Sequence, residues 1–298
     1  MNIQVEDFIK DFLAKDRELP PLLVILGPTA SGKTALSLEV AKKFTGEIIS
    51  ADSRQIYRHM DIGTDKIPVD KRGGIPHHLI DVAEPTERFT VADFKRLAEK
   101  TIDDILSRGK LPMLVGGTGL YIRAIVKNFA IPPENPEIKK RILEELARTG
   151  KENLHKKLKE LDPEGAAKLH PNNVPYVVRA LEILLATGKP KRDAKKQPRY
   201  DCLQIGLNPP REILFQRIDE RVDSQITRGL IEEVKSLMKY RDCASMLTLG
   251  YREVIQYLDG KISLDTATEL IKKNTRSFAK RQMTWFKSDT NVFWVNPS

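Results

Sequence analysis

Residues 27–34 place two glycines, a lysine and a threonine at the spacing of a phosphate-binding loop, G-x-x-x-x-G-K-T. In such a loop the glycines let the backbone turn tightly, so that its N–H groups face an anion at the start of a helix. Lys33 adds positive charge, and the hydroxyl of Thr34 is of the kind that binds magnesium. The sequence therefore predicts a site for a diphosphate or nucleotide, formed by Gly27, Pro28, Thr29, Ala30, Ser31, Gly32, Lys33 and Thr34.

Two more polar segments each follow a short apolar run. Asp52 comes after the run 47–51, and Gly116-Gly117-Thr118 closes the run 111–115. In an open parallel sheet, the carboxyl ends of the strands form the ligand crevice. We therefore expect Asp52 and Thr118 to lie near the phosphate loop. The position of Asp52 leaves three roles open: magnesium ligand, general base or helix cap.

These residues need an α/β framework to bring them together. Residues 22–26, 47–51 and 111–115 read as strands, and 90–108 reads as a helix with a Thr90/Asp93 capping pattern, ended by Gly109. The alternation of strands and helices predicts an α/β fold: a P-loop NTPase-like parallel sheet flanked by helices.

The pattern changes after residue 129. Residues 130–202 are charged and helical in pattern, including a helix at 174–188 with Val178, Leu181 and Leu185 predicted to face inward. Residues 202–207 then read as a strand that returns to the sheet. We therefore predict a core domain of residues 1–129 and 203–298, with a helical insertion domain at 130–202.

The composition is that of a soluble globular protein, with 40% hydrophobic and 31% charged residues among 298. No apolar run approaches the roughly 18 residues needed to span a bilayer. The first 20 residues lack the basic and apolar regions of a signal peptide, and Cys202 and Cys243 match no disulfide or zinc spacing. We expect a cytoplasmic protein that does not associate with a membrane.

Positive charge is concentrated in two segments. The formal net charge is +9, and residues 187–201 and 271–287 each contain six basic residues, against two acidic residues in the first and none in the second. Each segment alone is explained equally well by a solvated surface and by a binding surface. Together they favour a polyanionic partner.

The order of the motifs resembles a known family. The segments are GPTASGKT, SADSRQIYRHMDIGT, GIPHHLIDV, FTVADF, LVGGTGLYIRA, VVRALEI, GLIEEV, LGYRE and AKRQMTWF. They are similar, in this order, to those of tRNA dimethylallyltransferases over nearly the whole chain after residue 20. The sequence departs from that family at His59, where Gly is common, at Gln225, where Met is frequent, and in GTDKIP, where GTAKP is commoner.

This resemblance implies a reaction. The loop would hold the diphosphate of dimethylallyl diphosphate, and the five-carbon group would pass to the N6 amine of the adenosine 3′-adjacent to the anticodon. Magnesium on Thr34 would be the cofactor, Asp52 would take the amine proton, and Thr118 would contact substrate near the reaction centre. The spacing of Arg217, Arg221 and Arg228 places them on one stripe of a helix. A solvated helix face, with ion pairs to nearby acidic residues, would also explain this stripe. By family likeness Arg221 is the one that reaches phosphate, so the catalytic set is Asp52, Thr118 and Arg221.

The resemblance also implies that the anticodon stem-loop of tRNA is the partner and that the insertion contacts the anticodon arm. The target adenine must leave its stack to reach the donor. We expect a monomer with no obligate protein partner. The residues expected to contact tRNA are Asp52, Ser53, Arg54, Gln55, Thr118, Arg141, Pro175, Tyr176, Val177, Val178, Arg179, Thr248, Leu249, Gly250, Tyr251, Arg252, Thr275, Arg276, Ser277, Phe278, Ala279, Lys280, Arg281 and Gln282.

Three other functions fit part of the pattern. An adenylate isopentenyltransferase shares the chemistry but needs neither the insertion nor the basic segments. A P-loop small-molecule kinase fits the loop and the size, and a nucleotide-binding RNA module without catalysis fits the charge.

His77-His78 has no third ligand at metal spacing, so we predict a structural role for the pair.

Overall fold

The computed structural model describes residues 3–190 and 197–296. The chain forms two compact units, Met1–Lys127 with Pro198–Ser298, and Asn128–Gln197. These bounds lie within a few residues of the predicted ones, with the return to the core at Pro198 rather than at residue 203. Part of the predicted basic segment, residues 191–196, lies outside the described residues.

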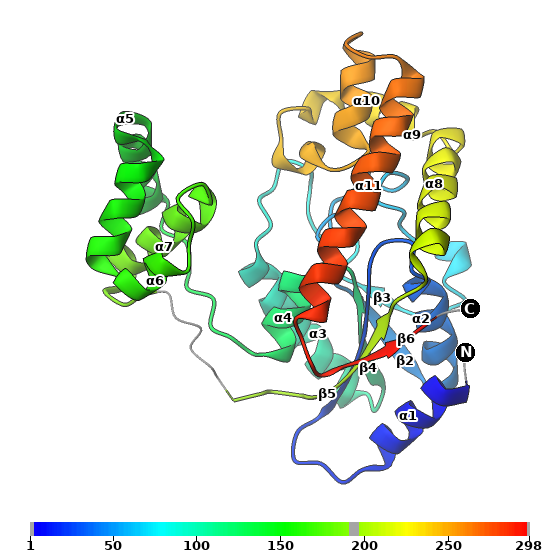
Figure 1. Cartoon of the computed structure of the whole chain (residues 1–298). Coiled ribbons are helices and arrows are strands. Elements are labelled where there is room, and N and C mark those ends of the chain that lie inside the picture. Colours follow the sequence, from blue (N-terminus) through cyan, green and yellow to red (C-terminus); the bar gives the residue numbers. More distant parts are fainter. Residues whose placement is uncertain (1–2, 191–196, 297–298) are drawn as a thin grey trace. The chain divides into compact units, whose positions relative to one another are not determined.

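The core unit is built on one sheet of parallel strands (Figure 1). The order across the sheet is β3-β2-β4-β1-β5-β6. Chain connections leave β1 and β5 toward opposite sides, which places the ligand crevice at the carboxyl end of β1. The predicted parallel α/β fold is confirmed. The strands are β1 (Pro21–Leu26), β2 (Gly46–Ser50), β3 (His77–His78), β4 (Leu111–Gly116), β5 (Asp201–Leu207) and β6 (Val292–Val295).

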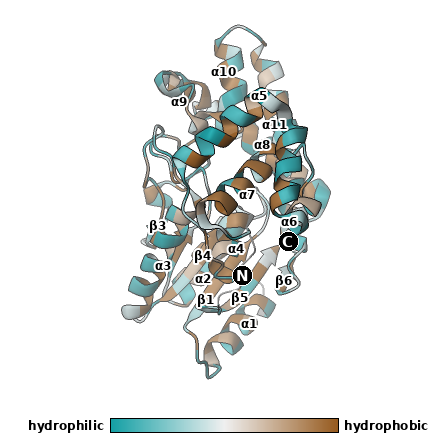
Figure 2. Cartoon of the chain, turned by 90° about the vertical axis from the view of Figure 1, so that its left-hand side faces the viewer, coloured by the Kyte–Doolittle hydropathy of each residue, from teal (hydrophilic) through white to brown (hydrophobic). Residues whose placement is uncertain are grey.

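Helices cover both faces of this sheet. The helices of the core unit are α1 (Ile3–Ala14), α2 (Lys33–Lys43), α3 (Val91–Ser107), α4 (Gly119–Val126), α8 (Arg211–Thr227), α9 (Leu230–Ser236), α10 (Tyr251–Leu258) and α11 (Leu264–Lys287). Short 3-10 turns are η1 (Val69–Lys71), η2 (Met238–Tyr240) and η3 (Ala244–Leu247). Residues of α1 and α2 pack on one face of the sheet, and residues of α3 and α4 on the other. Strands β1 and β4, enclosed between these layers, are largely hydrophobic (Figure 2).

Helix α3 shows how local sequence fixes an element. The Thr90 side chain accepts the Asp93 N–H, and the Asp93 carboxylate accepts the Thr90 N–H, which is the predicted capping box. Phe94, Ala98 and Ile102 are buried at helical spacing. Gly109 follows the helix with a φ of 67°, a conformation that favours glycine.

Two strands were missed by the sequence analysis. Strand β3 consists of only two histidines, so it has no apolar run to detect, and His78 turns its Nε2 to the Glu47 carboxylate at 2.8 Å. Strand β6 is a four-residue strand at the edge of the sheet, beside β5. Strand β3 is specified by its pairing with β2 and not by a local pattern. The Val-Phe-Trp-Val run of β6 does carry the residue types of a strand, but it is only four residues long.

The second unit contains α5 (Pro136–Leu161), α6 (Pro163–Ala167) and α7 (Val174–Thr187). Helix α5 is interrupted at Gly150, where φ is 83°. Val178 and Leu181 of α7 are buried as predicted, but the prediction for Leu185 was wrong, because this side chain is 46% exposed in the last turn of the helix. None of the helices described in either unit is long and apolar enough to cross a bilayer.

Candidate active site

The phosphate loop joins β1 to α2 and has the tight turns that the sequence predicted. Gly27 and Gly32 have φ values of 148° and 93°. A Cβ on Gly27 would lie 2.8 Å from the carbonyl oxygen of Leu207 in β5, so a larger residue does not fit. The Ser31 hydroxyl is buried and has no hydrogen-bond partner among the described residues. An anion in the loop would give this hydroxyl the acceptor it lacks.

Lys33 lies at the start of α2. Its Nζ donates a hydrogen bond to the carbonyl of Pro28 at 2.5 Å. Desolvation lowers the pKa of Lys33 to about 7, an effect that Asp52 opposes and Arg221 reinforces. Because a bound diphosphate would stabilise the charged ammonium, Lys33 can take up a proton when an anion binds.

Asp52 and Thr118 meet at the carboxyl edge of the sheet. The Thr118 hydroxyl accepts the Ser53 N–H at 3.0 Å, and Asp52 Oδ1 accepts the Arg54 N–H at 2.8 Å. Residues 53–56 form turns, so no helix begins at Asp52 and the helix-cap role is excluded. Both residues face the same cavity as the phosphate loop.

This cavity, of about 860 Å³, brings together most of the predicted site. Apolar side chains also line it, including Ile48, Ile67, Ile80 and Val115. Gly27 and Pro28 shape the loop without lining the cavity. The predicted residues that line it are Thr29, Ala30, Ser31, Gly32, Lys33, Thr34, Asp52, Ser53, Arg54, Gln55, Thr118, Arg221, Thr248, Leu249, Arg252, Thr275, Phe278, Arg281 and Gln282.

Other residues expected to contact tRNA lie outside this lining, within the described part of the core. They are Gly250, Tyr251, Arg276, Ser277, Ala279 and Lys280. The side chains of Tyr251 and Ala279 are fully buried in the protein. Any contact that these two residues make with a ligand would therefore use the backbone.

Gln282 links the phosphate loop to the end of β4. Its Oε1 accepts the Thr29 N–H at 2.9 Å, and its Nε2 donates to the Gly117 carbonyl at 2.9 Å. A Cβ on Gly117 would lie 2.3 Å from that Nε2, so the glycine is needed for this approach. Gln282 as a whole is only 8% exposed, and both atoms of its amide are engaged inside the protein. Its contacts are those of a residue that positions the loop.

The predicted arginine stripe on α8 does face the cavity. Arg217, Arg221 and Arg228 all line it. The acid that pairs with the last two is not a neighbour on the helix. Asp65 Oδ2 lies 3.4 Å from Arg221, and Asp65 Oδ1 lies 2.8 Å from Arg228. Tertiary structure, and not helical spacing, supplies this partner.

On α11, the basic residues expected to contact phosphates are not equivalent. Arg276 binds both carboxylate oxygens of Asp219, at 2.5 and 2.7 Å. Lys280 lies with Nζ 5.6 Å from the ring centroid of Phe215. The Arg276 guanidinium is thus occupied by a carboxylate of the neighbouring helix α8.

In the second unit, the predicted contact residues differ in exposure. Tyr176 is 56% exposed, whereas Val177 and Val178 are buried. Arg179 lies 2.8 Å from the Glu182 carboxylate and donates to the Pro132 carbonyl at 2.5 Å. Pro175 and Arg141 are exposed. Exposed side chains are therefore available on α5 and at the start of α7.

Glu233 supports the site; it lies in the segment GLIEEV, to which the sequence alone assigned no role. Its carboxylate accepts the backbone N–H groups of Asp61, Ile62 and Gly63 at 2.9, 2.7 and 3.0 Å, and the Tyr251 hydroxyl at 2.6 Å. About 170 residues separate the carboxylate from that loop. No local spacing relates them, so only the fold reveals the contact.

The histidine pair has structural contacts. The Nδ1 of His77 hydrogen-bonds the Ile75 carbonyl at 2.8 Å, and His78 contacts Glu47. Among the described residues, no group of three or more His, Cys, Asp or Glu side chains could hold a metal ion by itself. A metal in this cavity would need other ligands as well, such as hydroxyl groups, water or substrate oxygens.

Fold and site together define a P-loop α/β protein whose anion-binding loop opens on a partly apolar, arginine-lined cavity. A family model for IPP transferase matches residues 55–289, and one for isopentenyl transferase matches residues 20–72. The chain belongs to the IPP transferase family.

Individual relatives agree with this assignment. The tRNA dimethylallyltransferase of Geobacillus thermodenitrificans is 49% identical over 283 residues, covering 92% of this chain and 90% of that protein. The crystal structure of the tRNA isopentenylpyrophosphate transferase of Bacillus halodurans is 45% identical, with a TM-score of 0.70 over 93% of this chain and 89% of that one. The structure of a eukaryotic dimethylallyltransferase acting on tRNA is 31% identical, with a TM-score of 0.82 over 93% of this chain and 74% of that one.

Proposed function

We propose that this protein transfers the dimethylallyl group from dimethylallyl diphosphate to the N6 amine of the adenosine 3′-adjacent to the anticodon in tRNA, and releases diphosphate. One observation carries the proposal. A single cavity is lined by the phosphate loop, by Asp52 and Thr118, and by apolar side chains. A prenyl diphosphate has a matching charged end and apolar end.

Charge that builds on the departing diphosphate needs stabilisation by preorganised donors. Lys33, the N–H groups of the loop and Arg221 are the donors in this proposal. The lone pair of an adenine amine is delocalised into the ring, so a base at the amine assists its attack. Asp52 takes that proton as the new carbon–nitrogen bond forms and the carbon–oxygen bond to diphosphate breaks. Thr118 orients the reacting groups beside it.

The residues present also fit a magnesium ion. Magnesium prefers oxygen ligands and is often held by few protein groups together with substrate phosphates and water. The Thr34 hydroxyl and the Asp52 carboxylate face the same cavity, and we propose Thr34 as the protein ligand. When bound, the ion would neutralise charge on the diphosphate.

We propose that tRNA contacts both units. In the core, the cavity lining includes Arg54, Arg252 and Arg281, which suit phosphate contacts. In the insertion, Pro175 and Tyr176 begin α7 and are exposed. We propose that this surface contacts the anticodon arm. The cytoplasmic location and the monomeric state are part of the same proposal, and light scattering of the purified protein tests the second.

The assay uses labelled dimethylallyl diphosphate with unmodified tRNA, with AMP, or with no acceptor. We expect label in tRNA alone. Label in AMP would indicate an adenylate isopentenyltransferase. Transfer of phosphate from ATP to a small molecule, without prenyl transfer, would indicate a kinase.

A further inference from the structure

Asp65 is an acidic group within the cationic part of the cavity. It lines the cavity together with Arg221 and Arg228, and pairs with both. The side chains of the pairs are 25% to 40% exposed, so water screens them in part. Arg221 is also close enough to Lys33 to influence its pKa. The guanidinium beside Asp65 therefore acts on the anion site itself.

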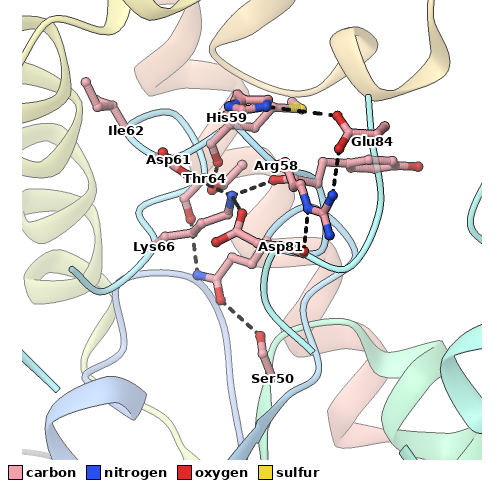
Figure 3. Close-up of polar contacts among 12 residues, drawn as sticks. Ser50, Arg58, His59, Asp61, Ile62, Thr64, Lys66, Asp81 and Glu84 are labelled. Atoms are coloured by element: carbon pink, nitrogen blue, oxygen red, sulfur yellow. Dashed lines mark hydrogen bonds and ion pairs between the residues drawn. The ribbon is translucent and has the colours of Figure 1, made fainter. Parts of the chain in front are cut away.

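The loop that carries Asp65 is held from two directions. Glu233 binds the N–H groups of residues 61–63, as described above. On the other side, the Lys66 ammonium contacts the Asp61 and Asp81 carboxylates at 2.7 and 2.5 Å (Figure 3). The Lys66 side chain is only 4% exposed. Asp65 is thus presented to the arginines by a fixed backbone.

Backbone conformation alone does not account for the carboxylate. Asp65 has a φ of 52°, in the left-handed region, which Asp and Asn tolerate better than most residues. An asparagine would satisfy this requirement equally well, and it has nearly the same shape. The charge of Asp65 is therefore separable from its backbone role.

We propose that Asp65 is an internal counterion for Arg221 and Arg228. A bound diphosphate displaces the Asp65 carboxylate from Arg221, and this competition weakens the retention of diphosphate in the site. Asp65 acts through the arginines and does not touch the reacting atoms. The inference rests on the proposed function, because it takes diphosphate as the ligand of the loop. Its consequence is a gain of affinity when the carboxylate is removed.

The test is calorimetric titration of inorganic diphosphate into wild type, Asp65→Asn and Asp65→Glu. Partly exposed ion pairs contribute little, so Asp65→Asn should lower the Kd by about two- to fivefold. Asp65→Glu keeps the charge but is less suited to a φ of 52°, so its Kd should not fall below that of wild type. The KM for dimethylallyl diphosphate should fall with Asp65→Asn by a similar factor.

Asp103→Asn is the matched control. Asp103 pairs with Arg199, is somewhat more exposed than Asp65 and does not line the cavity. Its loss changes the net charge equally and should leave the Kd unchanged. In an Arg221→Met background, Asp65→Asn should lose most of its effect. Damage to the fold could only weaken binding, so a tighter complex has no such explanation.

If wild type binds diphosphate and the Kd of Asp65→Asn is higher than that of wild type or unchanged, this inference is overturned and the proposed function is left intact. Wild type that does not bind diphosphate would instead overturn the proposed function. The two failures are therefore distinguishable.

Discussion

At the scale of single residues, the proposed mechanism gives the proton transfer to Asp52. Asp52→Ala should lower kcat by about 100-fold or more, because a positioned base contributes a factor of this order. Its measured tRNA affinity should remain near that of wild type. Asp103→Ala, remote from the cavity, is the control. A parallel loss of tRNA affinity would make Asp52 a positioning residue instead.

Lys33 should make anion binding depend on pH. In the free protein its pKa is about 7, and the complex favours the charged form, so binding takes up a proton above that pH. The affinity for diphosphate, relative to Lys33→Arg, should be constant below about pH 7 and fall above it by at most about tenfold per pH unit. The ratio removes the titration of diphosphate, which both proteins share. A ratio that is flat from about pH 6 to pH 9 would contradict the assignment.

At the scale of elements, α11 holds the phosphate loop through Gln282. Gln282→Ala removes the hydrogen bonds to Thr29 and Gly117. At roughly 1 kcal/mol each, their loss should raise the KM for dimethylallyl diphosphate about tenfold or more, with little change in tRNA affinity. Gln216→Ala, which removes an exposed contact to Glu220, is the control. A lower tRNA affinity with an unchanged KM for dimethylallyl diphosphate would show that Gln282 contacts tRNA directly.

The basic residues of α11 should differ in their effect on tRNA binding. Lys273 lies one turn before Arg276 on α11 and is exposed. Replacing Lys273, Arg276 and Lys280 by Ala should weaken tRNA binding and flatten its salt dependence. Arg276 is paired with Asp219, so most of the change should remain in the Lys273/Lys280 double variant. Affinities measured over a salt series test this. An unchanged slope in the triple variant would remove these residues from the interface.

Local signals predicted the elements that carry them. The capping box of α3 and the apolar runs of β1, β2, β4 and β5 are complete within a few residues, so their sequence was sufficient. Strand β3 and the Glu233 contacts depend on partners far away in the chain. The phosphate loop was predictable because its spacing is local. The pairing of Asp65 with Arg228 was not, because it joins two distant segments.

At the scale of the whole molecule, the insertion should serve tRNA and not the donor. The Asn128 side chain donates to the Gln197 carbonyl at 2.8 Å, so the ends of the insertion are adjacent. Replacing residues 129–196 by a short Gly-Ser linker should preserve diphosphate binding and lower tRNA affinity by at least about tenfold, since phosphate contacts would be lost. A thermal melt checks that the core remains folded. Unchanged tRNA affinity would contradict the proposed role of the insertion.

In the proposed reaction, the phosphate loop holds the diphosphate group of a prenyl diphosphate, which leaves as free diphosphate when the prenyl group is transferred. The most direct measurement is a crystal structure of the protein grown with dimethylallyl diphosphate and ATP together. We expect the diphosphate group to contact residues 27–34 and the prenyl chain to point toward Asp52 and Thr118. A nucleoside triphosphate in that loop, with no prenyl chain in the cavity, would contradict it.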